Sequence, residues 1–321
     1  MPRRRSLLLA PLLAAPAVAR AQDAFPNRPI SFTVPLTAGG PADVIFRPLG
    51  NALQAELGQP VVMDYRAGAG GTIAMDYAIR SRPDGHTLAI ASNSQYGIAP
   101  FLFPMPYDND RAYVPIILVA SAPSFVVVHR DVRATSLPEL IALAKARPDA
   151  MSFATAGVGF TSHLATELLM ARAGISMLHV PYRGAAAASQ ALIAGEVQMN
   201  FMEAAFLTGL LPGGGLRALA VTSPERHPLF PDVPTVAEAA IPGFETATYW
   251  GLVAPAATPA PVVERLRAAT LRFVNSDAER RRLLQAGFLP IAGDAAVFQR
   301  NKAEELAKWG PLIRDRNIRV T

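Results

Sequence analysis

The sequence contains no cysteine and little charge. The absence of cysteine among its 321 residues excludes a disulfide framework, a thiolate metal site, a cysteine nucleophile and a lipid-anchored cysteine. Charged residues make up 17% of the chain and hydrophobic residues 51%, which excludes an intrinsically disordered protein. The chain is too long for one small core, so we expect one large domain or two medium ones, held by ordinary hydrophobic packing.

Long apolar runs are scarce, and the one at the start of the chain is typical of a signal peptide. Arg3–Arg5 supply the charge, Leu7–Val18 the apolar run and Ala19-Arg20-Ala21 the cleavage site. The run is shorter than the ~20 residues of a spanning helix, which disfavours the alternative of an uncleaved membrane anchor. We expect cleavage of residues 1–21 after Ala21 and a periplasmic mature protein, with the general secretory and twin-arginine routes both open.

The net positive charge is confined to this leader. The whole chain has 30 basic and 25 acidic residues, but residues 1–21 contain four arginines and no acid. The remaining 300 residues therefore carry 26 basic and 25 acidic side chains. This balance predicts no nucleic-acid partner and no anionic-membrane partner.

From Phe25 onward, short apolar segments alternate with helical patterns. Strands are expected at 30–34, 61–63, 87–90, 116–119, 125–128, 152–154, 178–180, 197–201 and 217–221. Helices are expected to begin at Pro41, near Ser136, at Thr161 or Ser162, at Thr258-Pro259, at Ser276 and at Ala295. The alternation predicts an α/β fold with mostly parallel sheets, and the length favours two lobes.

Two glycine-bearing turns join a strand to a helix. The first turn runs from Val34 to Asp43 and contains Gly39-Gly40-Pro41, and the second runs from Ala154 to His163. Glycines let the backbone turn tightly and approach a ligand, and the free N–H groups of a helix start favour an anion. The two turns either face one carboxylate ligand across a cleft or are simply efficient strand-to-helix connections, and spacing alone leaves both interpretations open.

Motifs for enzymatic chemistry are weak. Gly68–Gly71 lacks both the dinucleotide fingerprint and the Gly-Lys-Ser/Thr of a phosphate loop. Ser162 and His163 are adjacent and lie outside G-x-S-x-G, so an exported hydrolase that uses them is only the alternative function. His163 and Glu167 do not form H-E-x-x-H, and no other group has metal-ligand spacing. We therefore predict no catalytic residue, no metal site and no cofactor.

Several segments, in order along almost the whole mature chain, resemble one family. They are PISFTVPLTAGGPAD (29–43), LGQPVVMDYRAGAGGT (57–72), PDGHTLAIAS (83–92), AGVGFTSHLATELL (156–169), LHVPYRGAAAASQALIAGEVQ (178–198), LRALAVTSPERHPLFPDVPTVAEA (216–239) and YWGLVAPAATPAPVVERL (249–266). The sequence resembles the Bug family, the TctC-like periplasmic solute-binding proteins of tripartite tricarboxylate transporters.

This resemblance implies a two-lobed fold like that of type II periplasmic binding proteins, with the ligand cleft between the lobes. Residues 22–122 plus 250–321 are expected to form the first lobe and 123–249 the second. The implied function is reversible capture of a small organic carboxylate for delivery to membrane permease subunits. The implied protein is a monomer.

The resemblance also implies a set of ligand-binding residues. They are Thr37, Ala38, Gly39, Gly40, Asp43, Ser92, Asn93, Ser94, Gly157, Gly159, Phe160, Thr161, Ser162, His163, Tyr182 and Met202. Ala38 stands where the family usually has proline, and Met202 stands where an aspartate is common. Because Met202 removes a carboxylate that would pair with an ammonium group, we expect a carboxylate without an ammonium group, aromatic or otherwise substantially apolar, and not aspartate, glutamate or citrate.

Overall fold

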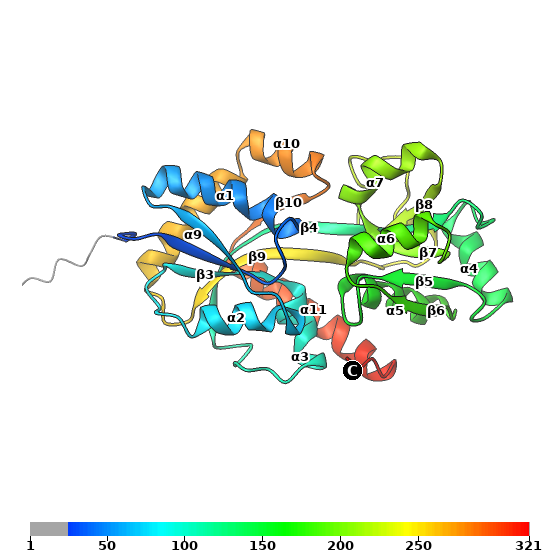
Figure 1. Cartoon of the computed structure of the whole chain (residues 1–321), viewed down its shortest axis with the longest axis horizontal. Coiled ribbons are helices and arrows are strands. Elements are labelled where there is room, and N and C mark those ends of the chain that lie inside the picture. Colours follow the sequence, from blue (N-terminus) through cyan, green and yellow to red (C-terminus); the bar gives the residue numbers. More distant parts are fainter. Residues whose placement is uncertain (1–24, 321) are drawn as a thin grey trace, which may run out of the picture.

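The computed structural model describes residues 25–320, and the predicted leader with its cleavage site lies outside them. Helices and strands form two α/β lobes that lie side by side, with β4 (Tyr113–His129) and β9 (Ala247–Pro255) running between them (Figure 1). The predicted α/β class is confirmed. Within the described residues, no helix combines the length and apolarity needed to span a bilayer.

The first lobe contains a sheet in the order β2-β1-β3-β9-β4, and β10 also pairs with β4. Its other elements are β1 (Ile30–Val34), β2 (Val61–Tyr65), β3 (Thr87–Ser92), β10 (Leu289–Gly293), α1 (Pro41–Leu57), α2 (Thr72–Ile79), α3 (Ala99–Leu102), α9 (Ala260–Val274), α10 (Asp277–Gln285) and α11 (Ala295–Asp315). α1 and α9 share one core with the sheet, and α2 and α11 contribute to another. Because β1 runs parallel to β2 and β3, the carboxyl ends of these strands meet at one edge.

Helix α1 illustrates how the sequence builds this lobe. Pro41 occupies the first helical position, where its fixed backbone angle suits the helix and its missing N–H costs nothing. Ile45, Leu49 and Leu53 are buried at a spacing of four residues, so they lie along one face. Gly58 ends the helix in the left-handed conformation, which glycine adopts without strain. The start of α1 is thereby fixed directly after the carboxyl end of β1.

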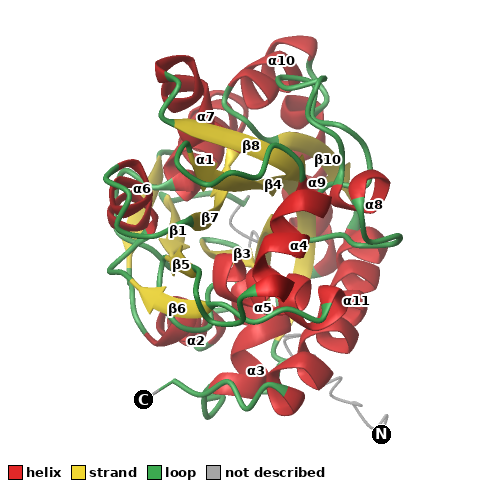
Figure 2. Ribbon diagram, turned by 90° about the vertical axis from the view of Figure 1, so that its right-hand side faces the viewer, coloured by secondary structure: helices red, strands yellow, loops and turns green. Residues whose placement is uncertain are grey.

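The second lobe contains β4-β7-β5-β6, with β8 also paired to β4. Its other elements are β5 (Ser152–Thr155), β6 (Leu178–Pro181), β7 (Met199–Glu203), β8 (Leu216–Val221), α4 (Leu137–Ala146), α5 (Thr161–Ala173), α6 (Ala185–Ile193), α7 (Ala204–Leu210) and α8 (Val236–Ala239). Figure 2 shows α4, α5 and α11 on one side of this sheet, where their apolar residues share one core. Ser136 caps α4, as predicted, by accepting a hydrogen bond from the Glu139 amide.

β4 is one strand where two were expected. The predicted segments 116–119 and 125–128 belong to a single strand that changes partner along its length. Pro123 still pairs with Ala247 of β9, whereas Ser124 already pairs with Glu203 of β7. No glycine or turn dipeptide separates the two halves, so the chain passes directly from one lobe into the other.

Helix α11 also contacts both lobes. Phe298 near its start packs in the first lobe with Met75, whereas Trp309 near its end packs in the core of the second. Arg316, just past the helix, donates to the Glu167 carboxylate of α5 over 2.7 Å. The expected assignment of the whole 250–321 segment to the first lobe therefore does not describe the end of α11, because its last turns bury their apolar face against the second lobe (Figure 1).

Candidate functional site

The first turn is organised by the carboxylate of Asp43. This side chain accepts a hydrogen bond from the Gly39 amide over 2.6 Å, another from Arg47 Nη2 over 2.7 Å, and a short one from the hydroxyl of Tyr65. Burial acts to raise the pKa of the Asp43 carboxyl, but the hydrogen bonds from Tyr65, Gly39 and Arg47 outweigh it and hold the pKa below its usual value. The predicted ligand contact Asp43 is thus engaged in shaping the turn.

Free backbone amides remain at the start of α1. Thr37, Ala38 and Gly39 are exposed, and Gly40 caps the helix without any side-chain hydrogen bond. Within residues 25–320, the amides of Gly40 and Ala42 have no protein acceptor. Since these N–H groups also lie at the positive end of the helix dipole, they are suited to an anion.

The second turn uses its glycine amides internally. The Gly157 amide donates to Thr155 Oγ1 over 3.3 Å, and the Gly159 amide donates to His163 Nδ1 over 3.2 Å. Both glycines have positive φ, 136° and 81°, a backbone conformation that glycine adopts without strain. The turn therefore needs glycine at these two positions. In this structure both amides are engaged within the protein, and their predicted contact with a ligand stays a prediction.

The free amides of the second turn lie one step further on, at the start of α5. Phe160 is the N-cap, so neither Thr161 nor Ser162 caps the helix as predicted. Ser162 Oγ instead accepts from the Ala156 amide over 3.4 Å, which ties the loop to the helix. In the described part of the chain, the Thr161 and Ser162 amides have no protein acceptor. α5 therefore offers an anion the same kind of helix terminus as α1.

His163 is a buried acceptor. Its ring stacks on His179 with 4.1 Å between ring centroids, and burial together with His179 lowers the pKa of His163 to about 3. Because Nδ1 accepts the Gly159 amide, the neutral ring carries its proton on Nε2, 3.7 Å from Glu167 Oε1. Across residues 25–320, no hydrogen bond joins His163 to Ser162, so the geometry gives no support to the hydrolase alternative.

The segment after β3 is mostly engaged within the protein. Ser92 donates to the Gln95 amide oxygen from its backbone and from its hydroxyl. Asn93 is fully buried, and its side chain bonds Ala247 of β9, the Tyr249 amide and Glu305 of α11. Ser94 is partly exposed. Ser92 and Asn93 therefore stabilise the junction of β3, β9 and α11, and of the three only Ser94 keeps surface that a ligand can contact.

The remaining predicted residues lie in different surroundings. Tyr182 donates its hydroxyl to Glu196 over 3.2 Å. Met202 is 2% exposed and packs in the core of the second lobe, in one cluster with Phe125. Phe160, by contrast, is 42% exposed at the start of α5 and presents apolar surface beside the free amides. The expectation that Met202 sets the ligand class stays a prediction.

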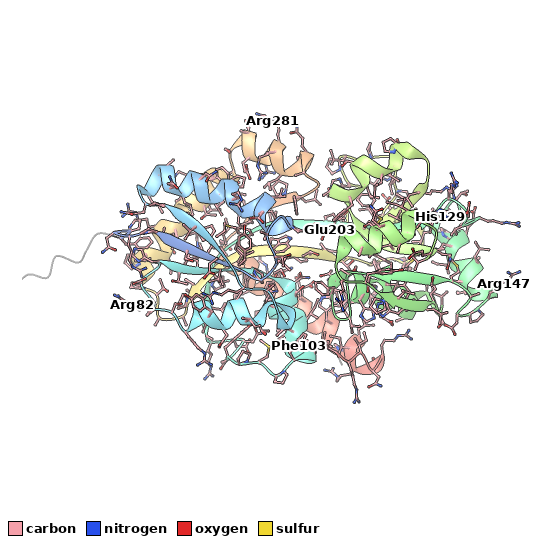
Figure 3. The ribbon with its side chains drawn as sticks, viewed as in Figure 1. Arg82, Phe103, His129, Arg147, Glu203 and Arg281 are labelled. Carbon is pink, nitrogen blue, oxygen red and sulfur yellow. The ribbon has the colours of Figure 1, made fainter. Side chains whose placement is uncertain are left out.

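Glu203 is a polar group that the predicted site left out. β7 continues through Glu203, so it points to the opposite face from Met202 and its carboxylate accepts from Thr248 Oγ1 of β9 over 3.2 Å. Figure 3 shows Glu203 in the middle of the molecule, between the lobes. Burial raises the pKa of Glu203 to about 7, although part of the residue remains accessible.

Two surface hollows lie elsewhere. One of about 660 Å³ runs along α2 and is lined by Arg66, Thr72 and Tyr77, and another of about 260 Å³ lies beside β2. Neither is lined by the two turns. Close contact between the lobes occurs at the second turn, where a Cβ on Gly159 would lie 2.5 Å from Leu102 Cδ1 of α3. In residues 25–320, no group of three or more acidic or histidine side chains is placed to hold a metal ion.

Comparisons with known proteins agree on one family. The family model described as tripartite tricarboxylate transporter family receptor matches residues 45–318. A UPF0065 protein encoded between tcbD and tcbE in Pseudomonas sp. (strain P51) is 41% identical over 315 residues, covering 97% of this chain and 94% of that protein.

Solved structures agree with this assignment. A structure of R. palustris Rpa4515 with adipate is 32% identical with a TM-score of 0.84, covering 92% of this chain and all of the other. A structure of the periplasmic binding protein BugD is 31% identical with a TM-score of 0.79, again covering 92% of this chain and all of that one. The two-lobed fold of type II periplasmic binding proteins is thereby confirmed.

Proposed function

Because the chain belongs to the tripartite tricarboxylate transporter receptor family of periplasmic solute-binding proteins, we propose that it binds a small organic carboxylate between its lobes and delivers it to membrane permease subunits. This family is a receptor family and not an enzyme class. A solved relative with adipate supports a carboxylate ligand. The proposed mature protein is a periplasmic monomer that begins at Gln22.

The observation that carries this proposal is the pair of helix termini with free amides. Gly40 and Ala42 belong to α1 in the first lobe, and Thr161 and Ser162 belong to α5 in the second. Hydrogen bonds from backbone amides to a carboxylate are strong because the acceptor is charged, and both helix dipoles add to the attraction. A carboxylate held in this way needs no basic side chain.

The connections between the lobes support capture by closure. β4 changes partner between Pro123 and Ser124, and β9 enters the first lobe near Thr248. Rotation about these strands would bring the two helix starts onto one ligand and separate them again for release. Because α11 is packed in both lobes, the same rotation must bend this helix. Pro311 lies within α11 and has no backbone N–H to donate, so the helix is expected to bend there.

Calorimetry with a panel of carboxylates tests the proposal, with mass spectrometry of the ligand before and after binding. We expect saturable binding of a carboxylate that is recovered unchanged, and no binding of its amide or ester. Turnover of the bound compound would favour the hydrolase alternative instead. Mass spectrometry of any small molecule that co-purifies with periplasmic protein identifies the natural ligand.

A further inference from the structure

The acceptor of the second turn is joined to the end of α11 by a chain of side chains. The Gly159 amide donates to His163 Nδ1 over 3.2 Å, and the other ring nitrogen, Nε2, lies 3.7 Å from Glu167 Oε1. The second carboxylate oxygen of Glu167 accepts a hydrogen bond from Arg316 Nε over 2.7 Å. His163 and Glu167 are both buried. The turn that precedes α5 is therefore connected, through two buried side chains, to a residue just past α11.

The turn requires His163 to be neutral. Because Nδ1 accepts the Gly159 amide, the one proton of the neutral ring lies on Nε2, where it faces the Glu167 carboxylate. A protonated ring carries N–H on both nitrogens, so Nδ1 would face the Gly159 amide as a second donor. The amide would then lose its acceptor, which costs free energy. Any group that changes the charge of the ring therefore also changes the turn.

The groups that face His163 act on its charge in opposite directions. His179 of β6 stacks on the ring, and Phe153 of β5 continues the stack. Burial and His179 lower the pKa of His163 to about 3. The Glu167 carboxylate on α5 acts the other way, because a negative charge stabilises the imidazolium. Among residues 25–320, the positive side chain that pairs with Glu167, besides the ring itself, is Arg316, so Arg316 is the group that offsets this carboxylate.

The backbone after α11 fixes the place of Arg316. Asn317 has φ 48°, a left-handed conformation that ends the helix, and the Ile318 amide then donates to the Ile313 carbonyl over 3.0 Å. Ile318 is thereby buried in the core that α5 also lines. Ion pairs between exposed side chains contribute little, because both groups are free in water. Glu167 is buried, however, and Arg316 is held between the helix and an anchored residue, so this pair has a defined geometry.

We propose that Glu167 and Arg316 are positioning residues for ligand binding, which keep His163 neutral and leave its Nδ1 as the acceptor of the Gly159 amide. This inference rests on the proposed function. Glu167 attracts the proton on Nε2 and so selects the tautomer, and Arg316 balances the carboxylate so that the ring does not become protonated. The free amides at the start of α5 then stay in place for an anion. Because α11 is packed in both lobes, the ligand turn of the second lobe depends on a helix that begins in the first.

Removal of the charge of Arg316 has an effect of predictable sign. Arg316→Gln keeps an N–H donor for Glu167 but leaves the carboxylate unbalanced beside the ring. A charge of opposite sign at this distance moves a pKa by about 1–3, so the pKa of His163 should rise from about 3 toward about 5–6. As pH falls, the ring becomes protonated and the turn loses its acceptor. Ligand affinity relative to wild type should therefore be unchanged at pH 8 and about two- to tenfold lower at pH 5.

The first readout is the ring itself, measured by NMR of protein labelled with nitrogen-15 in its histidine rings. The chain has five histidines, and the signals of His163 are those that disappear in His163→Phe. In wild type we expect the neutral Nε2–H tautomer from pH 8 to pH 5, and in Arg316→Gln a titration within this range. Arg316→Lys retains the charge and should keep the ring neutral. Arg314→Gln is the matched control, because Arg314 is exposed in the last turn of the same helix and forms no ion pair within the described residues.

The second readout is calorimetry with adipate and with benzoate at pH 5, 6.5 and 8. We expect a loss of affinity that grows as pH falls in Arg316→Gln. The loss should be absent from the double variant Glu167→Gln/Arg316→Gln, because no carboxylate is left to favour protonation of the ring. If Arg316 only supported the fold, its substitution would lower affinity equally at every pH, and the second substitution would not reverse the loss.

A His163 ring that does not titrate between pH 8 and pH 5 in Arg316→Gln would overturn the role of the pair. An equal loss of affinity at pH 5 and pH 8, or a loss that persists in the double variant, would also overturn it. Each of these results would leave the proposed carboxylate function standing. If neither acid bound to wild type, the result would count against the proposed function, whereas the NMR titration would still decide whether Glu167 and Arg316 hold His163 neutral.

Discussion

The two glycine turns that precede α1 and α5 are stabilised by different chemistry. In each turn, a side chain of the following helix accepts the amide of a glycine. In the first turn a carboxylate, Asp43, accepts the Gly39 amide near solvent. In the second turn a neutral imidazole, His163, accepts the Gly159 amide within a buried aromatic stack. The comparison shows that a similar glycine pattern in sequence does not imply a similar supporting group.

The difference also predicts where each turn is vulnerable. Water can replace part of the interaction around Asp43, because that side chain is 11% exposed beside a largely exposed Arg47. Water cannot easily reach the amide behind His163, whose side chain is 5% exposed. Loss of the acceptor should therefore cost more in the second turn than in the first.

The largest expected effect comes from placing a charge at the free amides of α1. Gly40 has φ −90°, and a Cβ there would meet nothing nearer than 3.6 Å, so a side chain fits without strain. Gly40→Asp caps the helix with its own carboxylate, which competes with the ligand and repels its charge. Calorimetry should show at least a ~100-fold loss of affinity, about 3 kcal/mol, while the melting temperature stays equal or rises. Gly40→Ala is the matched control, and equal losses in the two variants would contradict competition by charge.

The next effect concerns the buried acceptor of the second turn. His163→Phe keeps an aromatic ring against His179 but leaves the Gly159 amide without an acceptor. Urea denaturation should show a loss of about 1–3 kcal/mol in the free energy of unfolding, together with weaker ligand binding. Unchanged stability would show that the turn does not depend on His163.

The pH dependence of stability sharpens the same point. The pKa of His163 is about 3 in the folded protein and near 6.5 when unfolded, so the unfolded chain binds more protons between these values. The stability that the neutral His163 gives the folded protein is fully present above pH 6.5 and is lost as pH falls toward 3. His163→Phe should therefore flatten the decline of unfolding free energy over this window. An equally steep decline in the variant would assign the effect to other groups.

A smaller effect is expected at the first turn. Asp43→Asn retains one oxygen for the Gly39 amide but loses the charge that also binds Arg47 and Tyr65. We expect the free energy of unfolding at pH 7, measured by urea denaturation, to fall by about 1 kcal/mol. Since the pKa of Asp43 is lowered in the folded state, wild type should lose this difference as pH falls below the usual range of an aspartate. A cost larger than that of His163→Phe would reverse the comparison.

The smallest difference separates two glycines of nearly equal conformation. Gly39 and Gly159 have φ of 85° and 81°, so alanine is strained by about 1–2 kcal/mol at either position. A Cβ on Gly39 meets open space, whereas one on Gly159 meets the Leu102 side chain at 2.5 Å. In denaturation experiments, Gly159→Ala should lower the free energy of unfolding by up to about 1 kcal/mol more than Gly39→Ala does. Rotation of the Leu102 side chain away from the new methyl group would reduce this difference. Equal costs would show that the contact between the lobes is loose.

Much of the fold was predictable because local signals and burial agree. The alternation of apolar strands and helices predicted the α/β class. The order of the family motifs predicted the two-lobed fold. The continuity of β4 was not predictable, since Pro123 resembles a break and only pairing with β9 and β7 keeps the strand extended. The second-lobe packing of α11 was missed because Trp309 fits either core by composition.

The site was predictable at the level of turns but not of atoms. Sequence located both helix starts, yet it could not tell which amides are used within the protein, because that depends on contacts such as Gly159 with His163. Asn93 is a polar residue after a strand, which is typical of ligand contacts, but long-range bonds to β9 and α11 occupy its side chain. Glu203 was left out of the predicted site, because its position at the lobe junction depends on the register of β7 with β4.

The most direct test of the central claim is a crystal structure of the protein with the carboxylate that binds most tightly in calorimetry. The account predicts ligand carboxylate oxygens about 2.7–3.2 Å from the amide nitrogens of Gly40 or Ala42 and of Thr161 or Ser162. It also predicts the Gly159 amide still bonded to His163. A ligand bound outside the junction of the lobes, or a carboxylate held by basic side chains and not by these amides, would contradict it.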